Sequence, residues 1–154
     1  MQSLPYARIA VRAAGGAGGI ALMQAIADAG GQPLMLVPFA TSIVMVLGSP
    51  EVSPARPRCI VGGHILSAIA GVACAALLGD ALWVSALGVG LAIVLMQACD
   101  AFHPPAGISP IIITTAHATP LFILSPVAAG ALILVAYAFA FHRLTGEKWP
   151  ERWV

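Results

Sequence analysis

The sequence has few charged and few aromatic residues. Only 8% of its 154 residues are charged and 6% are aromatic, whereas a soluble domain carries about 25% charged residues. The net charge of +1 is too small for a nucleic-acid-binding surface, so nucleic acid is excluded as a partner. Hydrophobic residues make up 60% of the chain and the mean hydropathy is +0.96. This composition predicts an integral membrane protein embedded in the lipid bilayer.

Cysteine is scarce as well, and no metal motif is present. Cys59, Cys74 and Cys99 stand singly in apolar segments, which excludes a disulfide framework and a CxxC site. No two histidines have the i, i+4 spacing of a metal-binding helix, so we expect no metal and no cofactor. A membrane metal or redox protein that uses these histidines and cysteines is the alternative. No nucleophile, base and oxyanion-hole arrangement favours an enzyme.

Long apolar runs are abundant. A helix needs about 20 apolar residues to cross the hydrocarbon core, and four stretches qualify: residues 7–28, 59–78, 81–99 and 120–142. Two further stretches, 33–48 and 104–118, contain prolines and hydroxyl residues and reach roughly 22–24 Å as helices. The sequence therefore predicts an all-α polytopic membrane protein, a single transmembrane domain over residues 1–154, with four long helices and two short or broken ones.

Lys and Arg are confined to three places along the chain: Arg8 and Arg12, Arg56 and Arg58, and Arg143, Lys148 and Arg152. The turns at 28–32, 79–81 and 118–120 contain none. Because positive residues favour the cytoplasmic side, six crossings place every Lys and Arg in the cytoplasm together with both termini. If the two short segments were re-entrant, Arg56 and Arg58 would instead lie outside the cell. We therefore expect six crossings in a bacterial inner (plasma) membrane.

The order of the segments suggests two related halves. Residues 7–78 and 81–142 each contain a long segment, a short segment and another long segment. The two units start on opposite sides of the membrane. Such an inverted repeat is typical of secondary transporters, whose substrate site lies where the two short elements meet. The small residues of "GGAGG" (15–19), "GGHILSAIAG" (62–71) and "GVG" (88–90) allow close helix packing. They also suggest a homo-oligomer, with a dimer favoured.

The short segments contain the prolines of the predicted site. In "DAFHPPAGISP" (100–110), Pro104 and Pro105 suit the first turn of a helix, and the N–H groups of a helix start attract an anion. Pro38 would start the equivalent element in the first unit, presenting Ala40, Thr41 and Ser42. The alternative is that the proline pair merely ends one helix and begins the next in a cytoplasmic turn.

Two histidines are the main ionisable candidates within these segments. His64 follows "GG" and has Ser67 one turn later, and it either makes a hydrogen bond across helices or belongs to a transport pathway. His103 precedes the prolines, so it is placed at the mouth of the broken helix to donate to an anion or to exchange a proton. Asp100 is near enough in sequence to orient it. His117 and His142 are expected at the ends of segments.

Two stretches resemble the HPP family of integral membrane proteins: "PFATSIVMVLGSPEVSPARPRCIVGGHILSAIAG" (38–71) and "HPPAG" (103–107). The family is usually described as having about four membrane spans, and the similarity covers about residues 33–143. The chain departs from the family pattern in reading "RPRC" in place of glutamine-proline-arginine-asparagine and "HPPAGISPI" in place of "HPPAGATAL". The matching motif residues are His103, Pro104, Pro105, Ala106, Gly107, Pro50, Pro54, Pro57, Arg58, Gly63, His64 and Ser67.

The resemblance implies membrane transport, with plant plastid and cyanobacterial relatives linked to nitrite. Together with the broken segments it predicts a transporter or channel for a small inorganic anion, with nitrite or nitrate as first candidates. A non-transporting membrane assembly subunit is the further alternative. Arg56, Arg58 and Asp100 are expected at the entrance, where the arginines would concentrate anions. The predicted substrate-binding residues are His103, Pro104, Pro105, Ala106, Gly107, Ser109, Ala40, Thr41, Ser42, His64 and Ser67.

Overall fold

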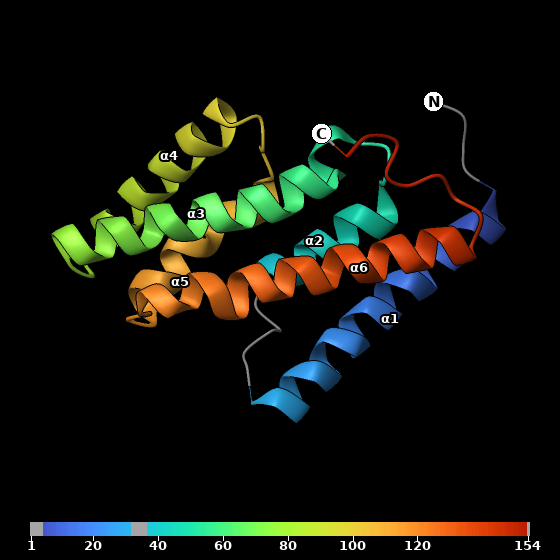
Figure 1. Ribbon diagram of the computed structural model, residues 1–154, viewed down its shortest axis with the longest axis horizontal. Helices are drawn as coiled ribbons and strands as arrows, with labels where there is room; N and C mark the ends of the chain where they lie inside the picture. Colours follow the sequence, from blue (N-terminus) through green and yellow to red (C-terminus); the bar gives the residue numbers. More distant parts are fainter. Residues whose placement is uncertain (1–4, 32–36, 154) are drawn as a thin grey trace.

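The computed structural model describes residues 5–31 and 37–153, and every regular element within these ranges is a helix (Figure 1). This confirms the all-α prediction. The elements in chain order are α1 (Tyr6–Gly30), α2 (Val37–Gly48), η1 (Ser53–Ala55), α3 (Pro57–Leu78), α4 (Leu82–Ala98), η2 (Pro104–Ile108), α5 (Ser109–Thr115), η3 (Pro120–Ile123), η4 (Leu124–Ala128) and α6 (Ala129–Leu144). The 3₁₀ turns η1, η2 and η3 each carry proline in their first turn, where a missing N–H costs least.

The described helices include three that are long and apolar enough to cross a membrane, where four had been predicted. They are α1, α3 and the run Pro120–Leu144, in which Ser125 has non-helical backbone angles between η3 and α6. The predicted long helix at 81–99 is α4, which has 17 residues and therefore measures about 26 Å, less than a hydrocarbon core of about 30 Å. Asp80 before it and Asp100 after it bound the apolar run. The predicted short element 33–48 contains α2, with 12 residues, and its positions 33–36 lie outside the described residues. The other, 104–118, corresponds to η2 followed by α5.

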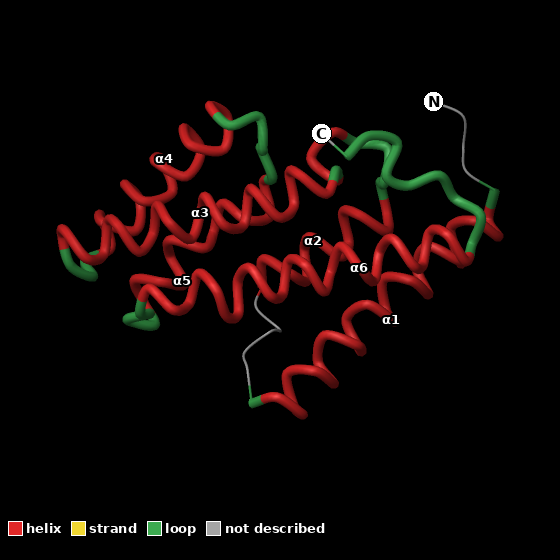
Figure 2. Tube along the Cα trace, viewed as in Figure 1, coloured by secondary structure: helices red, strands yellow, loops and turns green. Residues whose placement is uncertain are grey.

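The loops gather at opposite ends of the molecule. The 49–56 loop and the tail after α6 lie together at the right of Figure 2, whereas the turns at 79–81 and 116–119 lie at the left. Hydrogen bonds join the segments at the right-hand end. Arg12 donates to the Gly48 carbonyl (2.9 Å), and the Trp149 indole N–H donates to the Ala55 carbonyl (3.1 Å). The left-hand turns contain no Lys or Arg.

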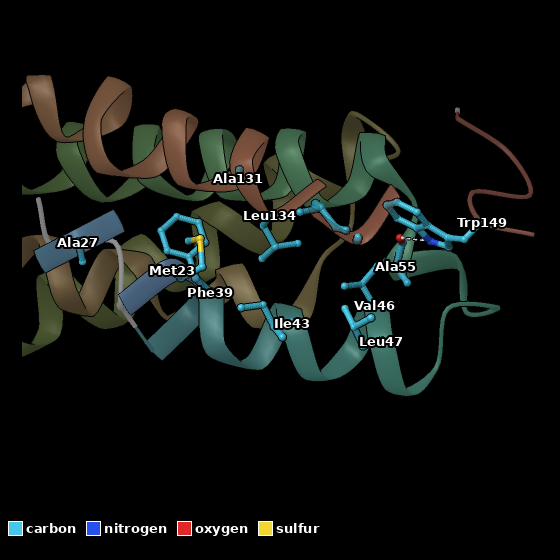
Figure 3. Close-up of a cluster of buried hydrophobic side chains, with 12 residues drawn as sticks. Met23, Ala27, Phe39, Ile43, Val46, Leu47, Ala55, Ala131, Leu134 and Trp149 are labelled. Atoms are coloured by element: carbon cyan, nitrogen blue, oxygen red, sulfur yellow. Dashed lines mark hydrogen bonds between the residues drawn. The ribbon is translucent and has the colours of Figure 1, made fainter. Parts of the chain in front are cut away.

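The largest apolar cluster lies between α1, α2 and α6 (Figure 3). Phe39 of α2 fills the space above Gly130 of α6, where an added Cβ would come within 2.6 Å of the Phe39 ring. Glycine at that position therefore sets how closely the two helices approach. The buried members are Met23, Ala27, Phe39, Ile43, Val46, Leu47, Ala55, Ile60, Ala131, Leu134, Ala138 and Trp149.

The glycine-rich stretches act in two different ways. Gly71 of α3 and Gly88 of α4 both face Pro110 of α5, and added Cβ atoms would lie 2.8 and 2.9 Å from it. This is the close packing that the sequence predicts. In "GGAGG", by contrast, Gly15 accommodates the ring of Phe141 and Gly19 that of Tyr137. There the small residues receive large aromatic side chains, so α1 packs on α6 through rings.

Candidate functional site

Two histidines and a serine meet inside the helical bundle. The Ser42 hydroxyl oxygen lies 2.9 Å from Nε2 of His64 and 2.7 Å from Nε2 of His103. The two imidazole centroids are 5.2 Å apart, and all three side chains are at most 1% exposed. Buried polar groups of this kind are stable when they satisfy one another, and these come from three segments far apart in sequence. We call Ser42, His64 and His103 the Ser–His cluster.

The local sequence explains why the cluster closes so tightly. His64 is preceded by Gly63, and a Cβ on Gly63 would lie 2.5 Å from Cβ of His103 and 3.0 Å from the Ala101 carbonyl oxygen. Ser42 stands near the middle of α2, and its hydroxyl also lies 2.7 Å from the Pro38 carbonyl oxygen one turn earlier. The glycine therefore lets the 101–103 segment rest on α3, directly opposite the serine.

The segment after His103 is anchored to α3. His103 has an extended backbone (φ −132°, ψ 95°), as the residue before a proline prefers, and its carbonyl accepts from the Ala106 N–H (3.0 Å). The Ser67 hydroxyl donates to the Ala106 carbonyl (2.7 Å). Ser67 and Ala106 are both fully buried. The same turn of α3 thus contains His64 and binds the first turn of η2 through Ser67.

A profile of the HPP transmembrane region matches residues 1–150. The chain belongs to the HPP family of transmembrane proteins. The resemblance that "HPPAG" and the 38–71 stretch indicate is thereby confirmed, and the structure gives both stretches a role. The histidine that opens the HPP motif and the histidine of "GGH" are partners of the same serine in "PFATS".

Two relatives of this HPP family chain are transmembrane proteins of Dictyostelium discoideum. One is 32% identical over 124 residues, which cover 75% of this chain and 44% of the relative. The other is 33% identical over 128 residues, which cover 77% of this chain and 41% of the relative. The chain thus spans less than half the length of these curated relatives. No solved structure matches it.

The structure divides the predicted substrate-binding residues of the HPP family chain into a buried set and an outer set. Ser42, His64, Ser67, His103, Ala106 and Ser109 are buried, whereas Ala40, Pro105 and Gly107 are half-buried and Thr41 and Pro104 are exposed. The Thr41 hydroxyl turns back to the Pro38 carbonyl (3.0 Å). Thr41, Pro104 and Pro105 line an open, largely apolar groove of about 660 Å³ between α2 and η2.

The predicted entrance residues lie at the loop end of α3. Arg58 donates to the Cys99 carbonyl (2.7 Å), and Arg56 lines a small pocket of about 240 Å³ with Glu51, Trp149 and Arg152. Asp100 is exposed and has a positive φ of 50°. Asp100 does not orient His103 as expected, because Nδ1 of His103 faces the Pro54 carbonyl (2.7 Å) and Nε2 faces Ser42.

Two members of the site come from residue types that sequence reasoning overlooks. Phe39 packs its ring on His64, with centroids 4.7 Å apart, and Pro54 contributes a backbone carbonyl. Pro54 belongs to the family motif, which indicates that the 50–57 loop has a role. The sequence does not reveal which donor the Pro54 carbonyl binds. The fold alone brings that loop over His103.

A second buried polar group lies between α1, α2 and the tail. His142, expected at an end of a segment, is fully buried because the tail folds back over it. Its Nε2 donates to the Val46 carbonyl (3.0 Å), and its Nδ1 lies 3.2 Å from a carboxylate oxygen of Glu147. The other oxygen of that carboxylate pairs with Arg12 at 3.1 Å. This group joins three elements at the basic end of the molecule.

Metal-ligating side chains do not converge within residues 5–31 and 37–153. No three His, Cys, Asp or Glu side chains lie close enough to hold a metal ion there. His117, on the turn opposite the basic end, pairs instead with Asp80 (2.7 Å), and both residues are exposed.

Proposed function

We propose that this HPP family protein transports a small inorganic anion across the membrane, with nitrite or nitrate as first candidates. The observation that supports this best is the Ser–His cluster, two imidazoles and a hydroxyl buried where α2, α3 and the start of η2 meet. Ionisable side chains at such depth are costly and mark ion and proton pathways. The family's nitrite-linked members suggest the class of substrate.

The chemistry of the cluster suits an anion, because an anion accepts hydrogen bonds. Ser42 and Ser67 each provide a hydroxyl donor, and an imidazole provides an N–H. In the described conformation these donors are taken up by other protein groups, since Ser67 donates to the Ala106 carbonyl and Ser42 binds the histidines. An anion would replace those bonds as η2 separates from α2 along the groove that Thr41 and Pro105 line.

The basic end of the molecule suggests the route of entry. Arg56 precedes α3 and lies two turns before His64, about 12 Å along the helix. Positive charge at a mouth raises the local concentration of anions. We propose that Arg56 and Arg58, with Asp100 beside them, form the entrance and that the positively charged end faces the cytoplasm of a bacterial cell.

We further propose the two-unit architecture and a dimer. Residues 7–78 and 81–142 each contain a short element, α2 in the first and η2 with α5 in the second, and the Ser–His cluster joins the two. An inverted repeat would place its substrate site at that junction. Gly16 of α1 and Gly90 of α4 have open space where a Cβ would stand, so a second copy has small residues to pack against.

The decisive experiment is an anion panel in proteoliposomes that contain only this protein. We expect uptake of nitrite or nitrate above that of protein-free vesicles, and a loss of about tenfold or more in His103→Ala and His103→Gln, equivalent to at least one hydrogen bond. His117→Ala, which changes an exposed histidine at the other end, is the matched control and is expected to keep the parent rate.

Three outcomes would count against the proposal. No uptake of any anion by folded, reconstituted protein would favour the non-transporting assembly subunit. Uptake that is equal in the parent, both His103 variants and His117→Ala would remove the Ser–His cluster from the pathway. Bound iron, copper or haem in the purified protein would support the metal or redox alternative.

A further inference from the structure

The direction of one hydrogen bond in the Ser–His cluster is set by chemistry. Nδ1 of His103 lies 2.7 Å from the Pro54 carbonyl oxygen. A carbonyl oxygen accepts and never donates, so Nδ1 carries the hydrogen. In a neutral imidazole the other nitrogen then has a lone pair. Nε2 of neutral His103 is therefore an acceptor, and it points at the Ser42 hydroxyl.

The remaining bonds of the neutral cluster follow from that assignment. Ser42 has a single hydroxyl hydrogen, and Nε2 of His103 needs it. The Ser42 oxygen keeps lone pairs, so the contact with Nε2 of His64 at 2.9 Å is satisfied when His64 donates. The neutral arrangement thus runs from His64 to Ser42, from Ser42 to His103, and from His103 to the Pro54 carbonyl.

A second arrangement satisfies the same atoms after one proton is added. With a proton on Nε2, His103 donates to the Ser42 oxygen, which then accepts from both imidazoles. The hydroxyl hydrogen turns to the Pro38 carbonyl oxygen, which lies 2.7 Å away. Each donor retains an acceptor, and the change requires rotation of one hydroxyl with no displacement of a heavy atom.

We propose that the Ser–His cluster is a proton-binding site that takes up one proton at Nε2 of His103, with the Ser42 hydroxyl turning between His103 and Pro38. The proton comes from hydronium in the bulk solvent and returns to water, so no other bond is made or broken. This proton-binding proposal does not depend on whether the protein transports an anion. The site would couple anion transport to proton movement if the function proposed above holds.

The groups packed around His103 limit the site to a single proton. His64 is the titratable group that faces it from α3, while α2 presents Ser42 and the Pro38 carbonyl and η1 presents the Pro54 carbonyl. At the neighbouring loop end, Arg56, Arg58 and Asp100 act electrostatically on Cys59. A second proton would place two like charges on rings 5.2 Å apart, inside a buried cluster that weakly screens them.

Nitrogen-15 NMR of the imidazoles tests the site directly, using full-length protein in lipid bilayers with labelled histidine. The chain has four histidines, and single His→Gln variants assign them. We expect the hydrogen of neutral His103 on Nδ1 and that of neutral His64 on Nε2. On acidification we expect His103 to become doubly protonated while His64 stays neutral. A hydrogen on Nε2 of neutral His103, or simultaneous charging of both rings, would overturn the proposal.

The Ser42→Ala variant tests the role of the hydroxyl. Without it, Nε2 of His64 loses its partner, and we expect His64 to show a mixture of both tautomers while His103 keeps its Nδ1 hydrogen on Pro54. Thr115→Ala is the matched control, because it removes an exposed hydroxyl that bonds back to the Ile111 carbonyl (2.7 Å) and makes no hydrogen bond to the Ser–His cluster. Unchanged tautomers in folded Ser42→Ala would refute the bridging role. The parent spectrum decides the protonation scheme independently of this variant.

Discussion

Cβ of His103 occupies the space that a side chain on Gly63 would need. An added Cβ at Gly63 would lie 2.5 Å from it, closer than side-chain carbons approach in proteins. The glycine of "GGH" on α3 and the histidine of "HPP" are therefore one packing unit, although 39 positions separate them in "GGH…HPP". His64, next to the glycine, reaches the same serine as His103 because the two backbones touch here.

We expect Gly63→Ala to destabilise the protein by about 1–3 kcal/mol, the usual cost of overpacking a filled interior. The new methyl group meets Cβ of His103 and the Ala101 carbonyl, neither of which is the free end of a flexible side chain. Thermal unfolding in detergent measures the change. Gly30→Ala is the control, since nothing lies within 4 Å of its added Cβ, and it should melt at or above the parent temperature. Equal melting of the two variants would contradict the packing argument.

We expect Glu147→Gln to lower the free energy of unfolding by about 1–3 kcal/mol, as the loss of charged hydrogen bonds does. The Glu147 carboxylate pairs with Arg12 (3.1 Å) and His142 (3.2 Å), and the side chains of Glu147 and Arg12 are only 16% and 11% exposed. A neutral amide leaves the Arg12 guanidinium without its counter-charge. Denaturant unfolding of the parent and the variant provides the measurement.

The control for that substitution is Glu151→Gln, which makes the same change of charge on an exposed residue of the same tail. We expect it to unfold within a few tenths of a kcal/mol of the parent, as exposed charges do. If Glu147→Gln and Glu151→Gln have the same free energy of unfolding, the contacts of the Glu147 carboxylate do not stabilise the protein.

The proposed orientation predicts which side of the membrane each end faces. Cys99 is exposed at the C-terminal end of α4, beside Arg58, whereas Cys59 and Cys74 are buried. A membrane-impermeant thiol reagent should therefore label the parent in inside-out vesicles and leave it unlabelled in right-side-out vesicles. In Cys99→Ser/Ala81→Cys, whose thiol lies at the opposite turn, the pattern should reverse. The opposite pattern in the two proteins would place the basic end outside.

The sequence predicted the segments well because each is defined by its own composition. Apolar runs and the residues that interrupt them are local properties, so 7–28, 59–78 and 120–142 each lie on a described helical run long enough to cross a membrane. The described part of 33–48 is α2. The exception is 81–99, where α4 stops at Ala98 and begins at Leu82, leaving 17 residues. The prediction counted the small residues at both ends as helix, whereas Ala81 and Cys99 have non-helical or cap geometry.

The predicted site depended on relations that composition does not contain. Ser42, His64 and His103 are all among the predicted residues, but so are the exposed Thr41 and the half-buried Ala40. A helix displays different residues on different faces, and the face of α2 that turns inward depends on the packing of Phe39 against Gly130. The prediction therefore selected the correct stretch of α2 without distinguishing the inward residue from its neighbours.

What the sequence alone determined is a helical membrane protein whose positive residues gather at one end, because hydropathy and charge are summed along the chain. What only the tertiary structure decided is which polar groups satisfy one another. The Pro54 carbonyl that orients His103, the serine between the two imidazoles and the burial of His142 under the tail all join segments distant in sequence. Hydrogen bonds act over about 3 Å, so they are settled only once the helices are packed.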